Sequence, residues 1–144
     1  MKRIITEPKE AIAQFVARGI DGHSADIGKY AAIGLEQDGK LIAGVVYYGL
    51  NGNCITASIH GIGNWPTREF LWYMFHYPFV EVGVKRITAT VETCNEKSHN
   101  FVKHLGFTPE ATLQLAGRHG DIHIYRMFPQ DCKWLKELSH GIRR

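Results

Sequence analysis

The sequence has few cysteines, no long apolar run and only a small excess of positive charge. Its three cysteines, Cys54, Cys94 and Cys132, include no C-x-x-C pair. We therefore predict neither a disulfide framework nor a cysteine zinc site, and we expect reduced thiols in a cytoplasmic protein. No apolar run approaches the roughly 18 residues that span a bilayer, and the N-terminus turns acidic at Glu7, so secretion and membrane association are not expected.

Two nucleotide-binding patterns are also missing. The sequence contains no Walker loop and no G-x-G-x-x-G fingerprint, because position 66 is Pro and no Gly-Lys-Ser/Thr follows. This absence disfavours nucleotide hydrolysis and NAD binding.

Length and composition favour one folded domain spanning residues 1–144. The chain has 144 residues, of which 44% are hydrophobic and 22% charged, as is ordinary for a globular domain. The net charge of +3 is spread along the chain, with only Arg143 and Arg144 adjacent at its end. A mild positive field suits a polyanionic small molecule as well as a nucleic acid, so charge alone does not choose between these partners.

Apolar periodicity and turn residues divide the first half of the chain into elements. One-sided apolar spacing predicts a helix over residues 8–18, with Gly19 as its stop. Two β-rich runs, 30–36 and 41–50, flank an Asp-Gly turn and predict a hairpin. The run 54–60 extends it to a third antiparallel strand, and the spacing over 66–77 predicts a helix that Pro78 ends.

The second half continues with a strand, a helix and a hairpin. The strand over 84–92 follows a helix and completes a βαβ crossover. A capping-box pattern at Thr93 to Glu96 begins a helix that Gly106 stops. Runs at 107–115 and 121–128 predict a second hairpin, and the tail could form a short helix that uses Trp134, Leu135 and Leu138.

One spacing in this pattern carries a family resemblance. Asn95 follows a strand, Ser98 lies three positions later, and Gly106 and Phe107 lie eleven and twelve positions after Asn95. Over residues 30–128 the chain resembles the GNAT superfamily of acetyl-CoA-dependent N-acetyltransferases, and it is also similar to GNAT-like proteins of phage genomes. The resemblance implies an α/β (α+β) fold with a mostly antiparallel sheet of six to seven strands. Helices would flank that sheet, and the strands near 54–60 and 84–92 would splay apart.

The resemblance also implies acetyl-CoA as co-substrate, with no metal. The family's acyl-CoA signature falls on Ser58 to Gly63, where both glycines match and Ser58 replaces the usual Gln or Arg. A glycine turn that opens a helix offers free N–H groups to a pyrophosphate. The residues expected to bind the cofactor are Ser58, Ile59, His60, Gly61, Ile62, Gly63, Asn64, Asn95, Ser98 and Phe101.

Three residues are candidates for the chemistry. The ordinary pKa of a histidine suits His60 to accept a proton at neutral pH. Glu92 ends the strand that is expected to diverge from the strand of His60. The family often takes its proton donor from a Tyr seven positions after the Asn, and that position is Val102. Tyr125 and Tyr73 are substitutes for it, both without positional support.

Each of these residues also has a structural interpretation. Asn95 may cap a helix as readily as it binds a ligand, and Gly61 and Gly63 may only form a turn. His119, Asp121 and His123 lie across a turn, which disfavours a metal site. The aromatic residues between Trp65 and Phe79 have the helical spacing of a core, although base stacking is an alternative.

The sequence leaves three functions open. The first is transfer of an acetyl group to a primary amine on a small molecule or a protein, by direct attack of the amine on the thioester. The enzyme would be a monomer or a homodimer. The second is a non-catalytic acyl-CoA-binding or regulatory module, and the third is an acyltransferase directed to nucleic acid. Residues 19–30 and 116–121 are the expected acceptor surface.

Overall fold

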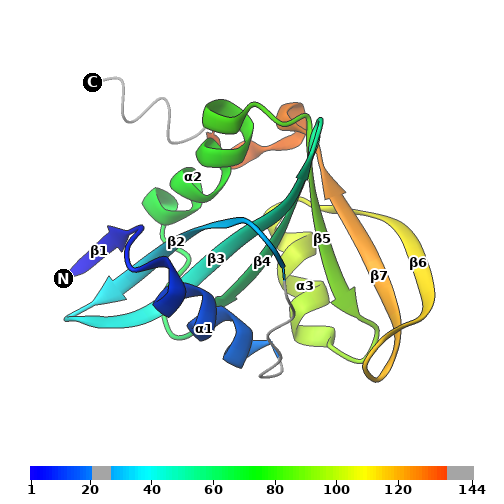
Figure 1. Cartoon of the computed structure of the whole chain (residues 1–144), viewed down its shortest axis with the longest axis horizontal. Helices are drawn as coiled ribbons and strands as arrows, with labels where there is room; N and C mark the ends of the chain where they lie inside the picture. The colour runs from blue at the N-terminus through cyan, green and yellow to red at the C-terminus, as the bar shows by residue number, and fades with distance from the viewer. Residues whose placement is uncertain (21–26, 136–144) are drawn as a thin grey trace.

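Seven strands of the described residues form one sheet, and helices cover both of its faces (Figure 1). The structure is a computed structural model, and it describes residues 1–20 and 27–135. In spatial order the strands are β1 (Lys2–Ile5), β2 (Tyr30–Gln37), β3 (Lys40–Asn51), β4 (Cys54–Gly61), β5 (Arg86–Glu92), β7 (Gly120–Met127) and β6 (Thr108–Gly117).

The sheet is antiparallel except at one place. β4 and β5 are parallel, and every other neighbouring pair is antiparallel. The chain passes from β4 to β5 through α2 (Arg68–His76), because parallel neighbours need a crossover connection. The predicted fold class, a mixed and mostly antiparallel sheet, is confirmed.

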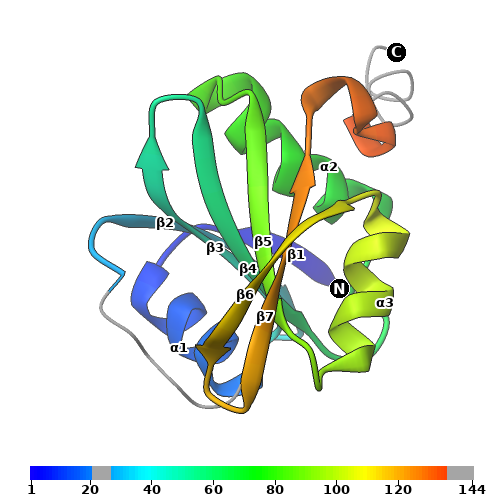
Figure 2. The ribbon, with the colours of Figure 1, turned by 90° about the vertical axis from the view of Figure 1, so that its right-hand side faces the viewer.

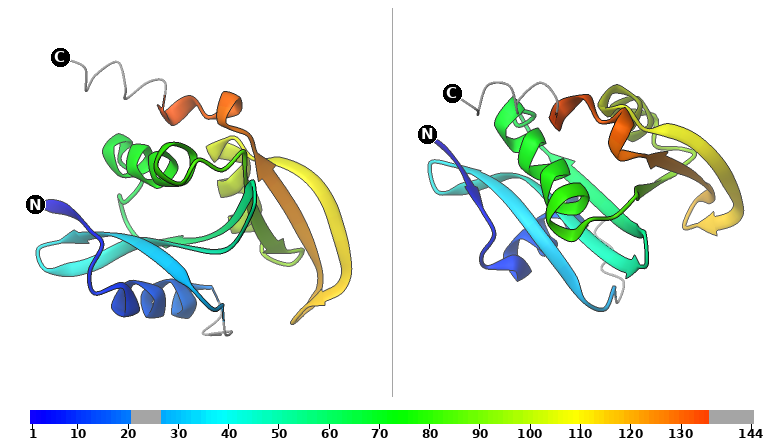
Figure 3. Two further views of the ribbon diagram at one scale, coloured as in Figure 1. Left: turned by 45° about the horizontal axis from the view of Figure 1, so that its top comes forward. Right: turned by 90° about the horizontal axis from the view of Figure 1, so that it is seen from above.

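The two faces of the sheet carry different helices. α1 (Lys9–Gly19) packs on one face of β2 to β4, where Ile12, Val16, Ala32 and Val46 form a small core. α2 and α3 (Glu96–Leu105) pack on the other face, as the two views of Figure 3 show. That second face holds the main core, which includes Phe70, Phe75, Ile87 and Leu105.

Capping residues begin α2 and α3 and end α3. Two predicted helix ends were wrong: α1 continues through Gly19 to a C-cap at Ile20, and the N-cap of α3 is Asn95 and not Thr93 of the predicted capping box. The Thr67 hydroxyl accepts a hydrogen bond from the Phe70 N–H at 3.1 Å, and the Asn95 side chain accepts one from the Ser98 N–H at 3.1 Å. Gly106 ends α3 with φ at 113°, a left-handed conformation that glycine adopts without steric cost.

The prediction that Pro78 ends the second helix was incomplete. α2 stops at His76, but the backbone continues as a wider π-type turn, Tyr77–Val82, with Pro78 near its start. Proline lacks an N–H and is tolerated in a first turn, where that group needs no helical partner.

Two further differences lie at the ends of elements. β1 was not predicted: it is only four residues long, and it pairs with β2 from Lys2↔Gln37 to Ile5↔Gly34. The predicted strand 84–92 begins at Arg86, because the Val84 and Lys85 N–H groups donate to the carbonyls of Pro78 and Asn53.

The tail after the sheet begins with a short helical turn. Pro129–Asp131 forms one 3-10 turn, and residues 133–135 are helical. Leu138 of the predicted tail helix lies outside the described residues. In the described ranges no helix has the length and apolarity needed to cross a membrane.

Candidate functional site

The parallel pair β4 and β5 separates partway along its length. The register between them runs from Cys54↔Arg86 to Thr56↔Thr88 and goes no further. Beyond that point Ala57 to Gly61 still pair with β3, and Ala89 to Glu92 still pair with β7. The predicted splay is therefore present, and it opens the sheet between the C-terminal halves of the two strands (Figures 1 and 2).

One edge of β4 faces the splay with its backbone groups unpaired. The Ile62 N–H donates to the Ile42 carbonyl of β3 at 2.8 Å. Because backbone groups of successive residues point to opposite edges of a strand, Ile59 and Gly61 direct theirs toward β5. β5 has already diverged there, so an extended ligand could pair with this edge as an added strand.

The turn after β4 does not open α2 directly, because α2 begins at Arg68 and is capped by Thr67. Gly63 has φ at +66°, and a Cβ built on it would meet no atom within 4 Å. The Lys2 ammonium donates to the Asn64 carbonyl at 2.9 Å, which fixes the loop and adds positive charge beside it. In the described ranges the N–H groups of Gly63 and Asn64 have no hydrogen-bond partner. Ile62, the first residue of the turn, is 52% exposed.

Gly61 has a structural role that the sequence did not show. A Cβ on Gly61 would overlap the Trp65 indole ring, so only glycine lets that ring lie against β4. Trp65 also contacts Phe101 of α3 at 5.0 Å and Phe70 of α2 at 5.9 Å between ring centroids. Trp65 thus links β4 to both helices. The Trp65 ring therefore occupies the space beside Gly61, whereas the space beside Gly63 is open.

His60 lies at the end of β4, on the face that α1 covers. Its imidazole contacts the Phe15 ring at 5.2 Å and leaves no room for a side chain at Gly19. Burial lowers the pKa of His60 below its ordinary value, and the positive charge of Lys97 lowers it further. The imidazole is therefore neutral at pH 7 and able to accept a proton.

Ser58 and Glu92 lie on the same face of the sheet as His60, since side chains alternate along a strand. The Ser58 hydroxyl is 3.3 Å from the Tyr48 hydroxyl. The Glu92 carboxylate accepts a hydrogen bond from the His119 N–H at 2.8 Å. Glu92 is thus bound to the turn between β6 and β7, where Gly117 pairs with Gly120 at the end of the predicted hairpin.

The α3 residues of the predicted site have partners within the protein. Asn95 caps α3 through its side chain, and Ser98 supplies the N–H that it accepts. Phe101 lies against Trp65. Asn95 therefore caps a helix, which was its structural interpretation. Ligand binding by its side-chain NH₂ group stays a prediction.

Tyr125 belongs to a hydrogen-bonded group on the opposite face. Its hydroxyl is 2.6 Å from His99 Nδ1, and His99 Nε2 is 3.0 Å from the Glu92 carbonyl. A carbonyl only accepts, so Nε2 donates to it, and in a neutral ring Nδ1 accepts the Tyr125 proton. Burial raises the pKa of Tyr125 above its ordinary value.

His99 was missed in the sequence. It lies four residues after Asn95 in α3, and no motif distinguishes it from an ordinary helix residue. It joins α3 to both β5 and β7. Val102, in the family's proton-donor position, is buried in the main core with Leu105.

The histidines near the second hairpin do not converge on a metal. His123 Nδ1 is 2.9 Å from the Thr112 hydroxyl, and Asp121 accepts from the Leu115 N–H at 2.8 Å. Within residues 1–20 and 27–135, no group of three potential ligands could hold a metal ion. The aromatic residues between Trp65 and Phe79 pack mainly inward, as predicted: Phe70 and Phe75 of α2 and Phe79 of the π-type turn are buried, whereas Tyr73 is 41% exposed.

The predicted acceptor surface is only partly described. Residues 21–26 lie outside the described residues. Of the remainder, Gly19 lies against His60, and the backbone of His119 binds Glu92. Each of the two predicted segments therefore contacts a residue beside the splay: the first contacts His60 and the second contacts Glu92.

Comparisons with known proteins identify the fold. A scan against protein-family models and a search of curated proteins found no match. Among solved structures, a mutant of the spermidine N-acetyltransferase SpeG from Vibrio cholerae has a TM-score of 0.72 at 16% identity, over 93% of this chain and 96% of that chain. A dodecameric form of the Vibrio cholerae spermidine N-acetyltransferase has a TM-score of 0.67 at 15% identity, over 88% and 93%.

A third structure, described as a probable acetyltransferase, has a TM-score of 0.60 at 19% identity, over 71% of this chain and 62% of that chain. These likenesses extend over most of the sheet and its helices. The chain therefore has the fold of GNAT acetyltransferases, as the spacing from Asn95 to Phe107 predicted.

Proposed function

We propose that this chain is an N-acetyltransferase that moves an acetyl group from acetyl-CoA to a primary amine. The observation that carries the proposal is the splay, where the register of β4 and β5 stops at Thr56↔Thr88 and leaves the edge at Ile59 and Gly61 unpaired. The neighbouring structures are described as acetyltransferases, which supports the same chemistry.

The residues around the splay suit the parts of acetyl-CoA. The unpaired backbone of Ile59 and Gly61 can pair with the two amides of the pantetheine arm. The free N–H groups of Gly63 and Asn64 and the nearby Lys2 ammonium suit its pyrophosphate. Acetyl-CoA would supply the activated acetyl thioester there.

His60 is the residue best placed to act as general base. A primary amine is mostly protonated at neutral pH and must lose a proton before its nitrogen can attack a carbonyl carbon. His60 is held neutral by burial and by Lys97, so it can accept that proton. Because Gly19 and Phe15 pack against its ring, its position is fixed before the acceptor arrives.

Glu92 and Tyr125 are less suited to proton transfer than His60. The Glu92 carboxylate already binds the β6–β7 turn, and the Tyr125 proton is directed to His99. We therefore assign Tyr125 a role in joining β7 to α3 and leave protonation of the departing thiolate to solvent.

Calorimetry with acetyl-CoA tests the cofactor. We expect saturable binding, and desulfo-CoA should compete because it keeps the pantetheine and pyrophosphate groups. If folded protein releases or absorbs no heat with acetyl-CoA at high micromolar concentration, the proposal is wrong.

A free-thiol assay with a panel of primary amines, spermidine among them, tests turnover. His60→Gln should lower kcat/KM by about 10²–10⁴-fold, the usual contribution of a general base. His104→Gln, at an exposed position near the end of α3, is the matched control and should retain activity. Tyr125→Phe should lower stability by about 1 kcal/mol with kcat changed much less.

A second candidate function is a non-catalytic CoA-binding module. The observation that favours it is Val102, which is buried in the core at the position where the family often has its proton donor. Binding of acetyl-CoA with no thiol release above the background rate for any amine in the panel would select this function over transfer.

A further inference from the structure

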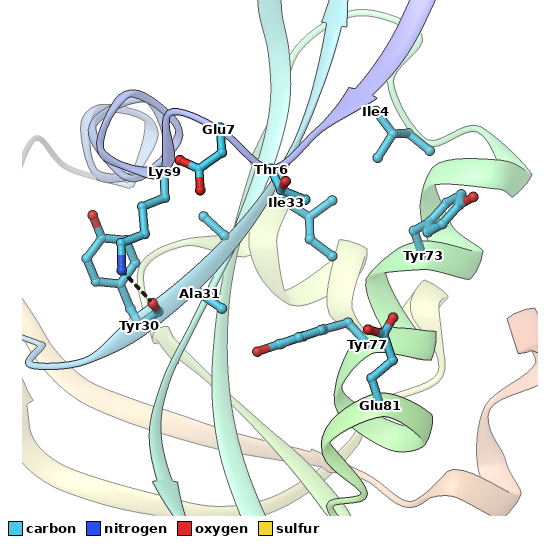
Figure 4. A pocket seen from close by; sticks show the side chains of 11 residues that line it. Ile4, Thr6, Glu7, Lys9, Tyr30, Ala31, Ile33, Tyr73, Tyr77 and Glu81 are labelled. Atoms are coloured by element: carbon cyan, nitrogen blue, oxygen red, sulfur yellow. Dashed lines mark hydrogen bonds between the residues drawn. The ribbon is translucent and has the colours of Figure 1, made fainter.

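A cavity of about 610 Å³ lies away from the splay, between β2, the start of α1 and the helical segment that follows β4. Figure 4 shows its walls: Glu7, Lys9 and Tyr30 on one side, and Tyr73, Tyr77 and Glu81 on the other. Ala31 and Ile33 of β2 form its floor. Its size is that of a small-molecule site.

The floor of this cavity is an open strand edge. β1 pairs with β2 only from Gly34 to Gln37, so among the described strands Tyr30 to Ile33 pair on the β3 side alone. The Lys9 ammonium donates to the Tyr30 carbonyl at 3.3 Å, which shows that this carbonyl points outward into the cavity. Backbone acceptors are therefore available to a ligand with N–H donors.

The chain itself places one ammonium group in this cavity. Lys9 Nζ lies 4.6 Å from the centroid of the Tyr30 ring, in addition to its bond with the Tyr30 carbonyl. The face of an aromatic ring attracts a cation through its quadrupole. One half of the cavity thus already binds an alkylammonium group, and the other half has the same kinds of side chain without a lysine.

That other half is formed by Tyr73, Tyr77 and Glu81. Tyr73 is 41% exposed, so its ring is accessible to a ligand that enters the cavity. Within residues 1–20 and 27–135 the Glu81 carboxylate has one ion-pair partner, His76, whose Nδ1 lies 3.3 Å away, and the Glu81 side chain is 58% exposed. In the described ranges Glu7 has no ion-pair partner, so the two carboxylates outnumber the Lys9 charge.

We propose that this cavity binds the ammonium group of a primary alkylamine. The charged group would lie between Glu81 and the Tyr77 ring, and the alkyl chain would lie over Ala31 and Ile33. The site does not depend on acetyl transfer. β3 and β4 separate it from the splay, a distance of roughly 12 Å at about 4.8 Å per strand, so an amine bound here is a second ligand and not the acceptor.

Titration of the isotope-labelled full chain with n-butylammonium chloride tests the site by NMR. Sodium chloride at matched ionic strength is the reference, and n-butanol is the uncharged control ligand. We expect saturable shifts at the amides of Ala31, Ile33 and Tyr77. Butylammonium should bind about fivefold more tightly than butanol, as an exposed ion pair and a cation–π contact together imply.

Two variants of one helical region separate this site from general attraction of cations. Glu81→Gln should weaken butylammonium binding about threefold to fivefold and leave butanol binding unchanged. Glu69→Gln removes an exposed carboxylate from the first turn of α2, outside the cavity, and should change neither. Tyr73→Ser, at an exposed position, should weaken both ligands.

The proposal is overturned by any of three results. The first is the absence of saturable shifts at the cavity amides. The second is equal affinity for butylammonium and butanol, and the third is equal weakening by the Glu81 and Glu69 substitutions. Because the readout is binding and not activity, failure here leaves acetyl transfer untouched, and failure of acetyl-CoA to bind leaves this site untouched.

Discussion

The sheet has two places where a strand loses its neighbour, and they differ in what surrounds the open edge. β4 is open beside the splay from Ala57 to Gly61, and β2 is open from Tyr30 to Ile33. At β4 an aromatic side chain of the protein, Trp65, lies against the strand at Gly61. At β2 the edge opens into a cavity with tyrosine and glutamate walls.

The difference indicates that an open edge alone does not decide what binds. Both edges offer backbone donors and acceptors. At β4 the adjoining turn adds free N–H groups and Lys2, which suit an anion. At β2 the adjoining side chains are rings and carboxylates, which suit a cation.

The largest effect is expected where Trp65 covers β4. Gly61→Val places a side chain where the indole ring lies, and overpacking of this kind should cost about 3 kcal/mol of unfolding free energy. Trp65→Ala should cost about 3–5 kcal/mol through the loss of a buried ring. Urea denaturation measures both.

The double variant tests whether the two residues act through one contact. With Trp65→Ala present, Gly61→Val should cost less than about 1 kcal/mol, because the space is then free. If the two costs simply add, Trp65 does not occupy the space beside Gly61, and the packing described for the face of β4 next to its open edge is wrong.

A smaller effect is expected at Gly63, where the space is open. Gly63→Ala should lower stability by about 1 kcal/mol, since φ is +66°. It should also weaken acetyl-CoA binding about tenfold, because the added methyl group occupies open space through which a phosphate would approach the N–H groups. Gly39→Ala is the matched control: its φ is +83° in a hairpin turn with nothing within 4 Å. It should cost similar stability and leave binding unchanged.

Most of the fold followed from local sequence signals. The Asp-Gly turn, the Asn95 cap and Gly106 each act within a few residues, and each lies where the structure needs it. β1 could not be predicted, because four residues carry no periodicity and their place depends on the distant strand β2. The π-type turn after His76 likewise depends on packing that follows Pro78.

The candidate site was less predictable than the fold. The place of the splay followed from the spacing of the family pattern, but the partners of its side chains did not. Gly61 matched the expected turn, yet it admits a ring four residues further on. His99 and the cavity beside β2 had no sequence signal, because each joins residues from several elements.

One substitution in the cavity beside β2 should strengthen binding of butylammonium. Lys9→Met removes the ammonium group that lies on Tyr30 and leaves the carboxylates of Glu7 and Glu81 in the cavity lining without the Lys9 charge. Butylammonium should then bind about threefold more tightly, because a nearby like charge is gone. NMR titration measures the change, and Lys40→Met, in the β2–β3 hairpin and outside the cavity lining, is the control. Weaker binding in Lys9→Met would mean that the ligand needs Lys9.

The smallest effect concerns the ionisation of His60 at the splay. Its pKa is lowered first by burial and then by Lys97, so Lys97→Gln should move that pKa upward toward the ordinary value of about 6.5. Lys103→Gln, further along the same helix, should leave it unchanged. Titration of the His60 Cε1 proton by NMR measures the shift.

The same change should appear in stability. Because the folded-state pKa is below the unfolded one, the contribution of His60 is complete above about pH 6.5 and is lost as pH falls toward the folded-state pKa. Lys97→Gln brings the two values closer, so the free energy of unfolding should fall less between neutral and mildly acid pH. An unchanged pH dependence together with an unchanged His60 titration would show that α3 does not influence the end of β4. The pKa of the proposed base, His60, would then be lowered by its burial against α1 alone.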